Sequence, residues 1–332
     1  MNNTLNDDYK RHINYLRISI TDRCNLRCTY CMPPDGMNLL AHHDILSYEE
    51  IVRIAQIAVN EGMSKIRITG GEPLVRKGVV NLVHNLSRLE GIKDLSMTTN
   101  GILLSEYARP LADAGLQRVN VSMDSLQPGL FKDITRGGDL SLVWKGIEKA
   151  QDAGLSPIKI NVVAIQGFND SEIIDFARLT INNDYQVRFI EFMPIGNGNG
   201  WHQEKYLSGL KIRTIIEEHH MLEPVLPSPE GMRGPAELYR FPGAQGMIGF
   251  INPISSHFCA TCNRLRLTAD GKLRPCLFAD QEIDIMQPLR SAGTDEELKV
   301  LLHKALSSKP KGHTVMEPTF RKCTRDMVAI GG

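Results

Sequence analysis

The chain has 332 residues, 42% hydrophobic and 23% charged, a globular composition that excludes disordered, collagen-like and coiled-coil proteins. Lys plus Arg and Asp plus Glu both number 38, so no net charge draws the chain to nucleic acid or to an anionic membrane. No apolar run reaches the roughly 18 residues of a membrane-spanning helix, and the N-terminus is unlike a signal peptide. The seven cysteines therefore predict a cytoplasmic protein, in which thiols serve metals or catalysis more often than disulfides.

Short β-branched segments alternate with helical patterns along the first two thirds of the chain. The predicted strands cover residues 16–21, 65–69, 95–99, 118–124, 158–165 and 187–193. A capping box of Ser47 and Glu50 opens the first helix, and further helical patterns lie near residues 78–89, 104–114, 141–153 and 171–182. This alternation predicts a parallel sheet, because each crossover helix connects strands that run in the same direction.

Each predicted strand has an apolar face and a polar face. Apolar side chains alternate with Arg17, Ser19 and Thr21 in the first strand and with Lys65 and Arg67 in the second. A closed eight-stranded barrel fills its interior with apolar layers. The α/β pattern therefore predicts an open, partial (βα)6 TIM-like barrel, with helices outside and a hydrated, cationic lumen inside. An antiparallel sheet with one solvated face would also alternate, but the long helical connections disfavour hairpins.

The pattern changes after residue 193. A glycine-rich loop, a helical segment, a Pro/Gly-rich stretch, two short strands and a helix capped by Thr294 and Glu297 follow, near residues 196–200, 208–219, 224–243, 237–241, 247–251 and 294–306. We place a soft boundary near residue 220. It separates a partial barrel over residues 1–220 from a C-terminal α+β extension over residues 221–332.

The first cysteine group, Cys24, Cys28 and Cys31, forms a CxxxCxxC motif just past the first predicted strand. Three thiolates on one loop can converge on one metal centre, and thiolates select iron–sulfur clusters or zinc. Structural zinc sites usually close at four ligands drawn from cysteine pairs. Three thiolates with no evident fourth ligand nearby favour a 4Fe-4S cluster with one iron open to another ligand.

The second group is Cys259, Cys262 and Cys276, and a predicted hairpin returns the third cysteine beside the CxxC pair. The spacing alone suits zinc and iron–sulfur equally, although the lack of a convincing fourth ligand again leaves an open position. His257 is a candidate fourth ligand, but a lone surface histidine is the commoner case. Cys323 stands apart, and we expect it to be structural.

Strand parity places Arg264 and Arg266 on the same side as Cys262. Arginine pairs bind phosphate by charge-assisted hydrogen bonds of about 1.5–3 kcal/mol each. A single arginine is usually a solvated charge. Six cationic side chains either have inward parity or lie beside the second cysteine group, and together they favour a polyanionic ligand. They are Arg17, Arg67, Lys159, Arg188, Arg264 and Arg266.

The motif Gly70-Gly71-Glu72-Pro73 directly follows the second predicted strand. Its glycines would let a ligand approach the backbone, and the Glu72 carboxylate is expected to be free to accept from an ammonium or hydroxyl group. Alone the motif could be a tight turn, but its position one strand after CxxxCxxC strengthens the prediction of a binding site.

CxxxCxxC with Tyr30 beside its last cysteine, followed by the Gly-Gly-Glu-Pro motif, resembles the radical S-adenosylmethionine (SAM) superfamily. The second cysteine group around Cys-Asn-Arg-Leu-Arg-Leu-Thr and the terminal Gly-Gly resemble the MoaA family in particular. Its members are GTP 3′,8-cyclases, radical SAM lyases that begin molybdenum cofactor (molybdopterin) biosynthesis. The resemblance covers residues 16–332.

The resemblance implies two 4Fe-4S clusters, one on Cys24, Cys28 and Cys31 and one on Cys259, Cys262 and Cys276. The open iron of the first would bind the amino and carboxylate groups of SAM, among Tyr30, Gly71, Ser122 and Met193. The open iron of the second would bind guanine. The residues implied around GTP are Arg17, Arg67, Thr98, Lys159, Arg264 and Arg266.

The resemblance further implies that a 5′-deoxyadenosyl radical removes hydrogen from ribose C3′ and that the carbon radical attacks guanine C8. The product would be (8S)-3′,8-cyclo-7,8-dihydroguanosine 5′-triphosphate, with Arg17 assisting the late reduction or protonation. The tail of Gly331 and Gly332 would reach the active site and be needed for catalysis. Asp326, just before this tail, is not anticipated and leaves the local path of the tail open.

The implied partners are a second copy of the chain in a homodimer, an electron donor such as flavodoxin or ferredoxin, and a downstream MoaC-like cyclic pyranopterin monophosphate synthase. No nucleic acid or membrane partner is expected. Two alternatives stay open. One is another radical SAM enzyme with an auxiliary cluster, such as a peptide-maturing one, although those usually carry more auxiliary cysteines and lack Arg-Leu-Arg. The other is a zinc-stapled binding module.

Overall fold

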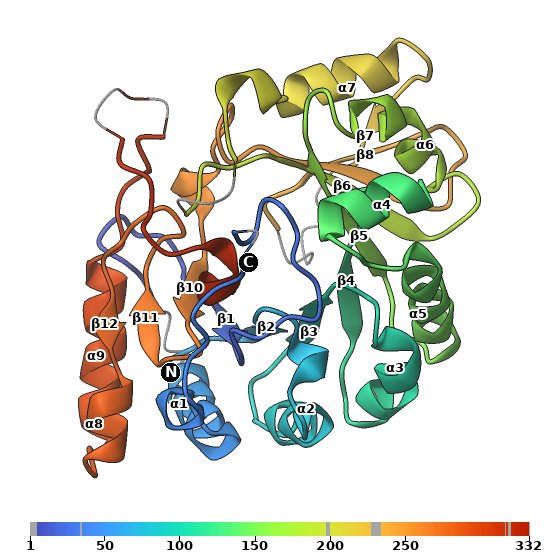
Figure 1. The fold of residues 1–332 in the computed structure, drawn as a ribbon. Helices are drawn as coiled ribbons and strands as arrows, with labels where there is room; N and C mark the ends of the chain where they lie inside the picture. The colour runs from blue at the N-terminus through green and yellow to red at the C-terminus, as the bar shows by residue number, and fades with distance from the viewer. Residues whose placement is uncertain are drawn as a thin grey trace.

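The computed structural model describes residues 5–33, 35–196, 200–226, 234–315, 317 and 320–331. Its centre is a set of parallel strands that pair in sequence order (Figure 1). These strands are β1 (Tyr15–Ser19), β2 (Lys65–Thr69), β3 (Asp94–Thr99), β4 (Arg118–Ser122), β5 (Ile158–Ala164) and β6 (Tyr185–Glu191). The predicted parallel sheet is confirmed, and the antiparallel alternative is wrong.

The C-terminal part of the chain extends this sheet at both edges. β10 (Arg264–Leu267) pairs in parallel with β1, and β9 (Met247–Ile251) pairs in parallel with β6. Antiparallel strands continue beyond them, namely β11 (Lys272–Arg274) and β12 (Ile283–Asp284) on one side and β8 (Glu237–Arg240) and β7 (Glu223–Pro224) on the other. Among the described residues the sheet therefore runs from β12 to β7 as an open, curved layer. The domain boundary near residue 220 stays a prediction, and one sheet continues across it.

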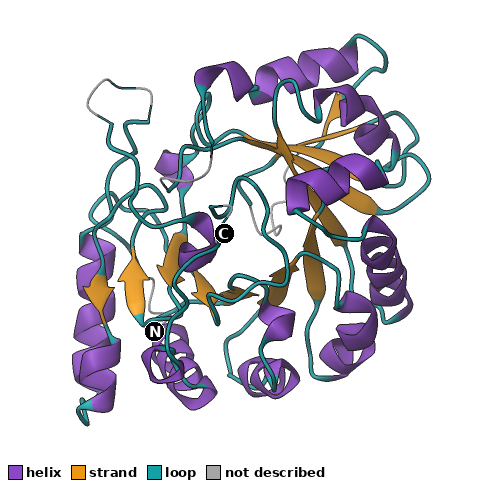
Figure 2. Cartoon of the chain, viewed as in Figure 1, coloured by secondary structure: helices purple, strands orange, loops and turns teal. Residues whose placement is uncertain are grey.

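Helices follow most of the strands and lie outside the curve (Figure 2). They are α1 (Tyr48–Asn60), α2 (Val79–Ser87), α3 (Leu104–Asp113), α4 (Pro128–Thr135), α5 (Leu140–Asp152), α6 (Ile173–Arg178) and α7 (Gly209–Glu217). Three more come near the end of the chain, α8 (Met286–Arg290), α9 (Asp295–Ser307) and α10 (Met327–Ile330). Figure 1 shows α10 inside the curve of the sheet, where the chain ends.

Both predicted capping boxes are present. Ser47 and Glu50 satisfy each other's backbone N–H groups at the start of α1, and Thr294 and Glu297 do the same for α9. The eight-residue α4 was not predicted. The predicted return strand is also shorter, so that Cys276 lies beyond β11.

The apolar strand faces and the helices form one continuous core. Leu16, Ile18, Ile66 and Ile68 are all at most 1% exposed within it. The polar face of each strand consequently turns toward the inside of the curved sheet, as the alternation predicted. In the part of the chain that the structure describes, none of the helices has the length and hydropathy of a membrane span.

Candidate active site

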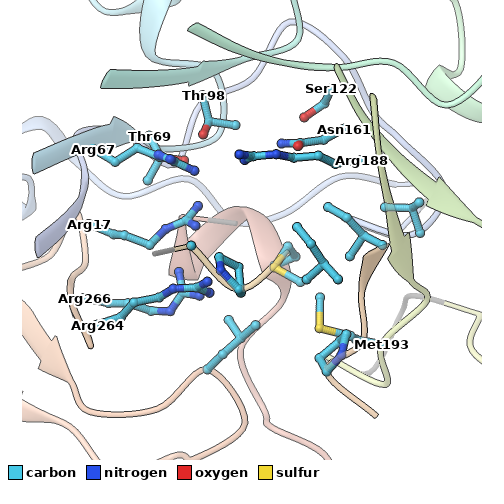
Figure 3. Close-up of a pocket in the computed structure, with 18 of the residues that line it drawn as sticks. Arg17, Arg67, Thr69, Thr98, Ser122, Asn161, Arg188, Met193, Arg264 and Arg266 are labelled. Atoms are coloured by element: carbon cyan, nitrogen blue, oxygen red, sulfur yellow. The ribbon is translucent and has the colours of Figure 1, made fainter. Parts of the chain in front are cut away.

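The polar face of the sheet borders a cavity of about 460 Å³ (Figure 3). Its lining includes both groups of three cysteines. It also includes the other predicted contacts, Tyr30, Gly71, Ser122, Met193, Arg17, Arg67, Thr98, Lys159, Arg264 and Arg266. The structure therefore gathers these residues around one space. Gly331 reaches the same region, and Gly332 lies outside the described residues.

Strand direction places the two cysteine groups at opposite ends of the cavity. Cys24, Cys28 and Cys31 follow the carboxyl end of β1. Cys262 precedes β10, which is parallel to β1, and therefore lies at the amino-terminal end of these strands. β11 runs back antiparallel to β10, so Cys276 returns to the end that holds Cys262. The predicted hairpin geometry is thus present.

The Gly-Gly-Glu-Pro motif holds the segment that leads into the first cysteine group. The Gly71 N–H donates to the Thr21 carbonyl at 2.7 Å, and the Glu72 N–H donates to the Arg23 carbonyl at 2.8 Å. A Cβ on Gly71 would collide with the carbonyl oxygen of Arg23. Glycine is required here because two chain segments meet backbone to backbone.

The expectation that the Glu72 carboxylate is free was wrong. Its Oε1 accepts from the Thr99 hydroxyl at 2.8 Å and the Leu74 N–H at 3.0 Å, and its Oε2 accepts from the Asn100 N–H at 2.6 Å. Glu72 is 1% exposed, and this burial raises its pKa to about 7. Because the buried carboxylate needs hydrogen-bond donors, it ties the end of β2 to the end of β3.

Tyr30 is fixed by a residue that the resemblance did not name. Its hydroxyl donates to Asp124 Oδ2 at 2.6 Å, and the Val163 N–H donates to Asp124 Oδ1 at 2.7 Å. Burial raises the pKa of Asp124 to about 6. In the sequence, Asp124 continues the two-residue alternation of Asn120 and Ser122, which is the signal that places this carboxylate on the polar face.

The donor chemistry at both ends fits thiolate-held clusters. All seven cysteines are free thiols. Burial raises the pKa of Cys24 to about 11 and holds that of Cys28 well above its usual range, so these thiols become thiolates only beside a strong positive charge, which an iron–sulfur cluster supplies. Among the described residues, no three Cys, His, Asp or Glu side chains form a ligand set for a single metal ion.

Arg11 and Lys309 hold the loops of the second cysteine group. The Arg11 guanidinium donates to the carbonyls of Cys259 at 2.9 Å and Pro310 at 2.8 Å. The Lys309 ammonium donates to the carbonyls of Arg264 at 2.8 Å and Pro275 at 2.7 Å. Sequence reasoning missed both residues, because each acts on segments far away in the chain.

His257 and Cys323 lie in the same region of the structure. His257 is exposed at the rim of the cavity, where its ring centroid lies 5.1 Å from that of His313. Cys323 is 1% exposed and accepts a hydrogen bond from Arg274 at 3.1 Å, a buried structural position as expected.

A band of positive charge lies between the two cysteine groups. The register places Arg17 directly between Arg67 and Arg266 on adjacent strands. Figure 3 shows the guanidinium groups of these three, with those of Arg188 and Arg264, directed into the same space. The lining also includes Lys65, already placed on the polar face, and parity extended along β1 to β4 would have added Tyr15, Asp94 and Arg118.

The pKa of Lys159 is lowered to about 6, first by burial and then by repulsion from the nearby Arg188, Arg118 and Arg67. The pKa values of Arg17 and Arg188 are also lowered, chiefly by burial. A cavity lined by this excess of cationic side chains favours an anion, which would relieve the repulsion.

The C-terminal segment enters the cavity as a short helix. Met327 and Val328 of α10 line the cavity, and Gly331 adopts a left-handed φ of +80°. A Cβ at this residue would lie 2.6 Å from the Cβ of Ser19, so glycine is needed for both its conformation and its packing. Asp326 occupies the N-cap position of α10, without a capping hydrogen bond from its side chain, and packs against Gly196, which gives the local path of the tail.

Sequence comparisons assign the chain to a family. The model of the Radical SAM superfamily matches residues 18–180, and that of Molybdenum Cofactor Synthesis C matches residues 185–315. A GTP 3′,8-cyclase from Alkaliphilus metalliredigens is 49% identical over 99% of this chain and 100% of its own length. One from Thermodesulfovibrio yellowstonii is 52% identical over 99% and 100%. The chain belongs to the GTP 3′,8-cyclase family.

Solved structures show the same fold at low sequence identity. Streptococcus suis SuiB bound to S-adenosylmethionine superposes with a TM-score of 0.61 and 16% identity, covering 96% of this chain and 77% of SuiB. The enzyme anSMEcpe with bound AdoMet gives a TM-score of 0.55 at 15% identity, covering 92% and 80%. The radical SAM fold of this GTP 3′,8-cyclase family member is therefore confirmed.

Family membership also separates the interpretations left open by the sequence. A zinc-stapled binding module does not fit the match to the Radical SAM superfamily. A peptide-maturing enzyme shares the fold, but the full-length relatives at about half identity are GTP 3′,8-cyclases.

Proposed function

We propose that the chain converts GTP to (8S)-3′,8-cyclo-7,8-dihydroguanosine 5′-triphosphate, the first step of molybdenum cofactor biosynthesis. One observation carries this proposal beyond the family assignment. A single cavity has three cysteines at each end and a band of arginines between them. A substrate that joins a polyphosphate to a metal-binding base fits such a cavity, since its two parts need different partners.

Cys24, Cys28 and Cys31 would hold a 4Fe-4S cluster beside SAM, and Cys259, Cys262 and Cys276 would hold a second one. When bound, the clusters and SAM would supply the radical chemistry at the ribose and an open iron for guanine. Gly71 would bring backbone close to SAM. Tyr30, which donates to Asp124, would border SAM together with Ser122 and Met193, and all three line the cavity.

The arginine band would bind the triphosphate and orient the nucleoside. Arg17, Arg67 and Arg266 lie side by side, and bidentate guanidinium–phosphate pairs fix both position and direction. Arg188, Lys159 and Arg264 add charge from the other strands. Among the described residues, the buried Thr98 hydroxyl has no hydrogen-bond partner, which leaves it available to the substrate.

Arg17 and the tail would act late in the reaction. Arg17 lies between Arg67 and Arg266 at the centre of the band, where it would assist reduction or protonation of the cyclised nucleotide. α10 would cover the cavity and exclude water, while Gly331 and Gly332 reach the reacting nucleotide. Orientation and exclusion of water are what a protein contributes to radical chemistry of this kind.

The test is an anaerobic assay of the reconstituted protein with dithionite, SAM and one nucleotide at a time. The proposal predicts that GTP releases 5′-deoxyadenosine together with a cyclised product, and that ATP, CTP and UTP do not. Equal release with all four nucleotides would contradict GTP as substrate. No release with any of them, from protein that holds iron, would contradict the reaction itself.

The same proposal includes the partners and the cellular setting. We expect a cytoplasmic homodimer, reduced by a flavodoxin or ferredoxin, that passes its product to a MoaC-like cyclic pyranopterin monophosphate synthase. The free thiols of all seven cysteines are consistent with a reducing compartment. We also keep the boundary near residue 220 as the proposed limit of the barrel region.

A further inference from the structure

The segment just before the tail is held by a charged network. The Arg325 guanidinium donates to both carboxylate oxygens of Asp270, at 3.0 and 2.8 Å, and to Glu282 Oε2 at 2.8 Å. The three side chains are only 26%, 17% and 16% exposed. A bidentate pair at this depth fixes the direction of the arginine as well as its position.

The network continues to the strand that leads to the second cysteine group. Arg274 of β11 is 1% exposed, donates to Glu282, and also donates to Cys323 Sγ at 3.1 Å. Two residues later the chain reaches Cys276. Asp270 lies in the turn between β10 and β11. The hairpin that ends at Cys276 therefore binds the segment 323–325 through two arginines and two carboxylates.

This anchor stands immediately before the tail. Asp326 follows Arg325 and is the N-cap of α10, a helix of only four residues. A single helical turn has no stability of its own, because nucleation costs more than one turn of hydrogen bonds returns. α10 must therefore be held from its ends and its buried face. At its far end Gly331 accepts one long hydrogen bond, of 3.4 Å, from Arg266.

The apolar face of α10 packs in a separate cluster. Its buried residues are Ile195, Cys323 and Ile330, and four partly buried side chains pack against them, namely Met193, Leu277, Phe278 and Met327. Apolar packing is non-directional, whereas the bidentate Arg325 pair fixes both position and direction at the start of the tail. Lysine cannot replace it, since an ammonium group cannot make two parallel hydrogen bonds in one plane.

We propose that Arg325 is a positioning residue that latches the C-terminal tail to the β10–β11 hairpin. Through Asp270 and Glu282, the latch couples the loop of the second cysteine group to the insertion of α10 into the cavity. An effect of the latch on kcat rests on the proposed function, whereas an effect on hydrogen exchange of the tail does not.

The test measures hydrogen–deuterium exchange of residues 323–331 and steady-state kinetics on the same reconstituted holoenzyme. Arg325→Ala is expected to speed exchange of this segment at least about tenfold and to leave exchange of β1–β6 unchanged. It is expected to lower kcat by about 10- to 100-fold and to leave KM for GTP within about twofold. The side chains that bind GTP are unchanged, whereas the tail is no longer held in its position. Iron content should stay that of the unchanged protein.

Two further variants show whether the pair itself is responsible. Arg325→Lys should give an intermediate exchange rate and an intermediate kcat. Arg325→Ala combined with Asp270→Asn should be no worse than Arg325→Ala alone, since both changes remove the same contact. Arg321→Ala is the matched control, because Arg321 is an exposed arginine of the same segment.

Unchanged exchange of residues 323–331 in Arg325→Ala, or full additivity of the two changes, would overturn the latch. Should Arg325→Ala fail to fold or to hold iron, Arg325→Lys is the deciding variant. If residues 323–331 of Arg325→Lys exchange as slowly as in the unchanged protein, the latch is overturned. If exchange rises as expected but the unchanged protein cyclises no GTP, the latch stands and the proposed function fails.

Discussion

The carbonyl oxygen of Gly331 lies 3.4 Å from a guanidinium nitrogen of Arg266. Arg266 belongs to β10, which lies between Cys262 and Cys276 of the second cysteine group, and it pairs in register with Arg17 of β1. The last described residue of the chain thus meets the arginine band between the two cysteine groups. The tail therefore completes the wall of the cavity, which Met327 and Val328 also line.

Removal of Gly331 and Gly332 is expected to abolish cyclisation while both clusters remain. The two residues lie after all the cysteines in the sequence, and Gly331 lies against Ser19 and accepts from Arg266. Iron content and product formation, measured on the same truncated protein, check this. Full turnover by the truncated protein would refute a role for the tail.

Binding of GTP is expected to take up about one proton at pH 8. Burial and the neighbouring arginines hold the pKa of Lys159 at about 6 in the cavity without substrate, so its amine is neutral at pH 8. A bound triphosphate favours the ammonium form and returns the pKa toward its ordinary value of 10.5. Affinity should therefore fall as pH rises from 6 toward 10.

Calorimetry in buffers of different ionisation enthalpy measures this proton uptake. Lys159→Met is expected to bind GTP more weakly, without the uptake and with a flatter pH dependence. Lys145→Met, a change at an exposed lysine, is the control. Equal proton uptake by Lys159→Met and the control would show that another group is responsible.

Glu72→Gln is expected to remove part of the pH dependence of folding stability. The folded pKa of Glu72 is raised to about 7 from 4.5, chiefly by burial. The buried acid therefore contributes most stability below pH 4.5, and this contribution is lost as pH rises through 7. Urea unfolding under anaerobic conditions at pH 5, 6, 7 and 8 compares the two proteins.

The free energy of unfolding of the unchanged protein, relative to Glu72→Gln, should fall by a few kcal/mol across this range. The glutamine side chain has no group that titrates there, so the difference isolates Glu72. A constant difference between pH 5 and pH 8 would contradict the assigned pKa shift.

Lys309→Met is expected to empty the second cysteine site alone. The Lys309 ammonium joins the carbonyls of Arg264 and Pro275, which flank the cysteines of that site, and its loss leaves both carbonyls buried without their donor. Iron should fall from about eight to about four atoms per chain. Lys311→Met, a change at an exposed neighbour, is the control and should retain all the iron. About eight irons per chain in Lys309→Met would contradict a role for Lys309 in the second cysteine site.

The local and periodic features of the fold were predictable from the sequence. Alternation along a strand fixes which side chains share a face, so Arg17, Arg67 and Lys159 could be placed inside the sheet before any strand order was known. Capping boxes fixed the start of α1 and α9 in the same way. The two-residue period of a strand and the 3.6-residue period of a helix involve only residues that are close in the chain, so both can be read from the sequence directly.

Contacts between distant segments could not be predicted in this way. The pairing of Arg17 with Arg266 joins strands about 250 residues apart, and no periodicity encodes it. Glu72 looked free because its partners, Thr99 and Asn100, come from the next strand. The grip of Lys309 on the second cysteine group is likewise a tertiary contact.

The most direct test of the account counts iron and zinc in protein purified and reconstituted without oxygen. The account predicts a brown protein with about eight irons per chain, and about four after Cys259, Cys262 and Cys276 are all replaced by alanine. Replacement of Cys24, Cys28 and Cys31 should leave about four as well. A colourless protein that holds zinc at both sites, or no metal at either, would contradict the account.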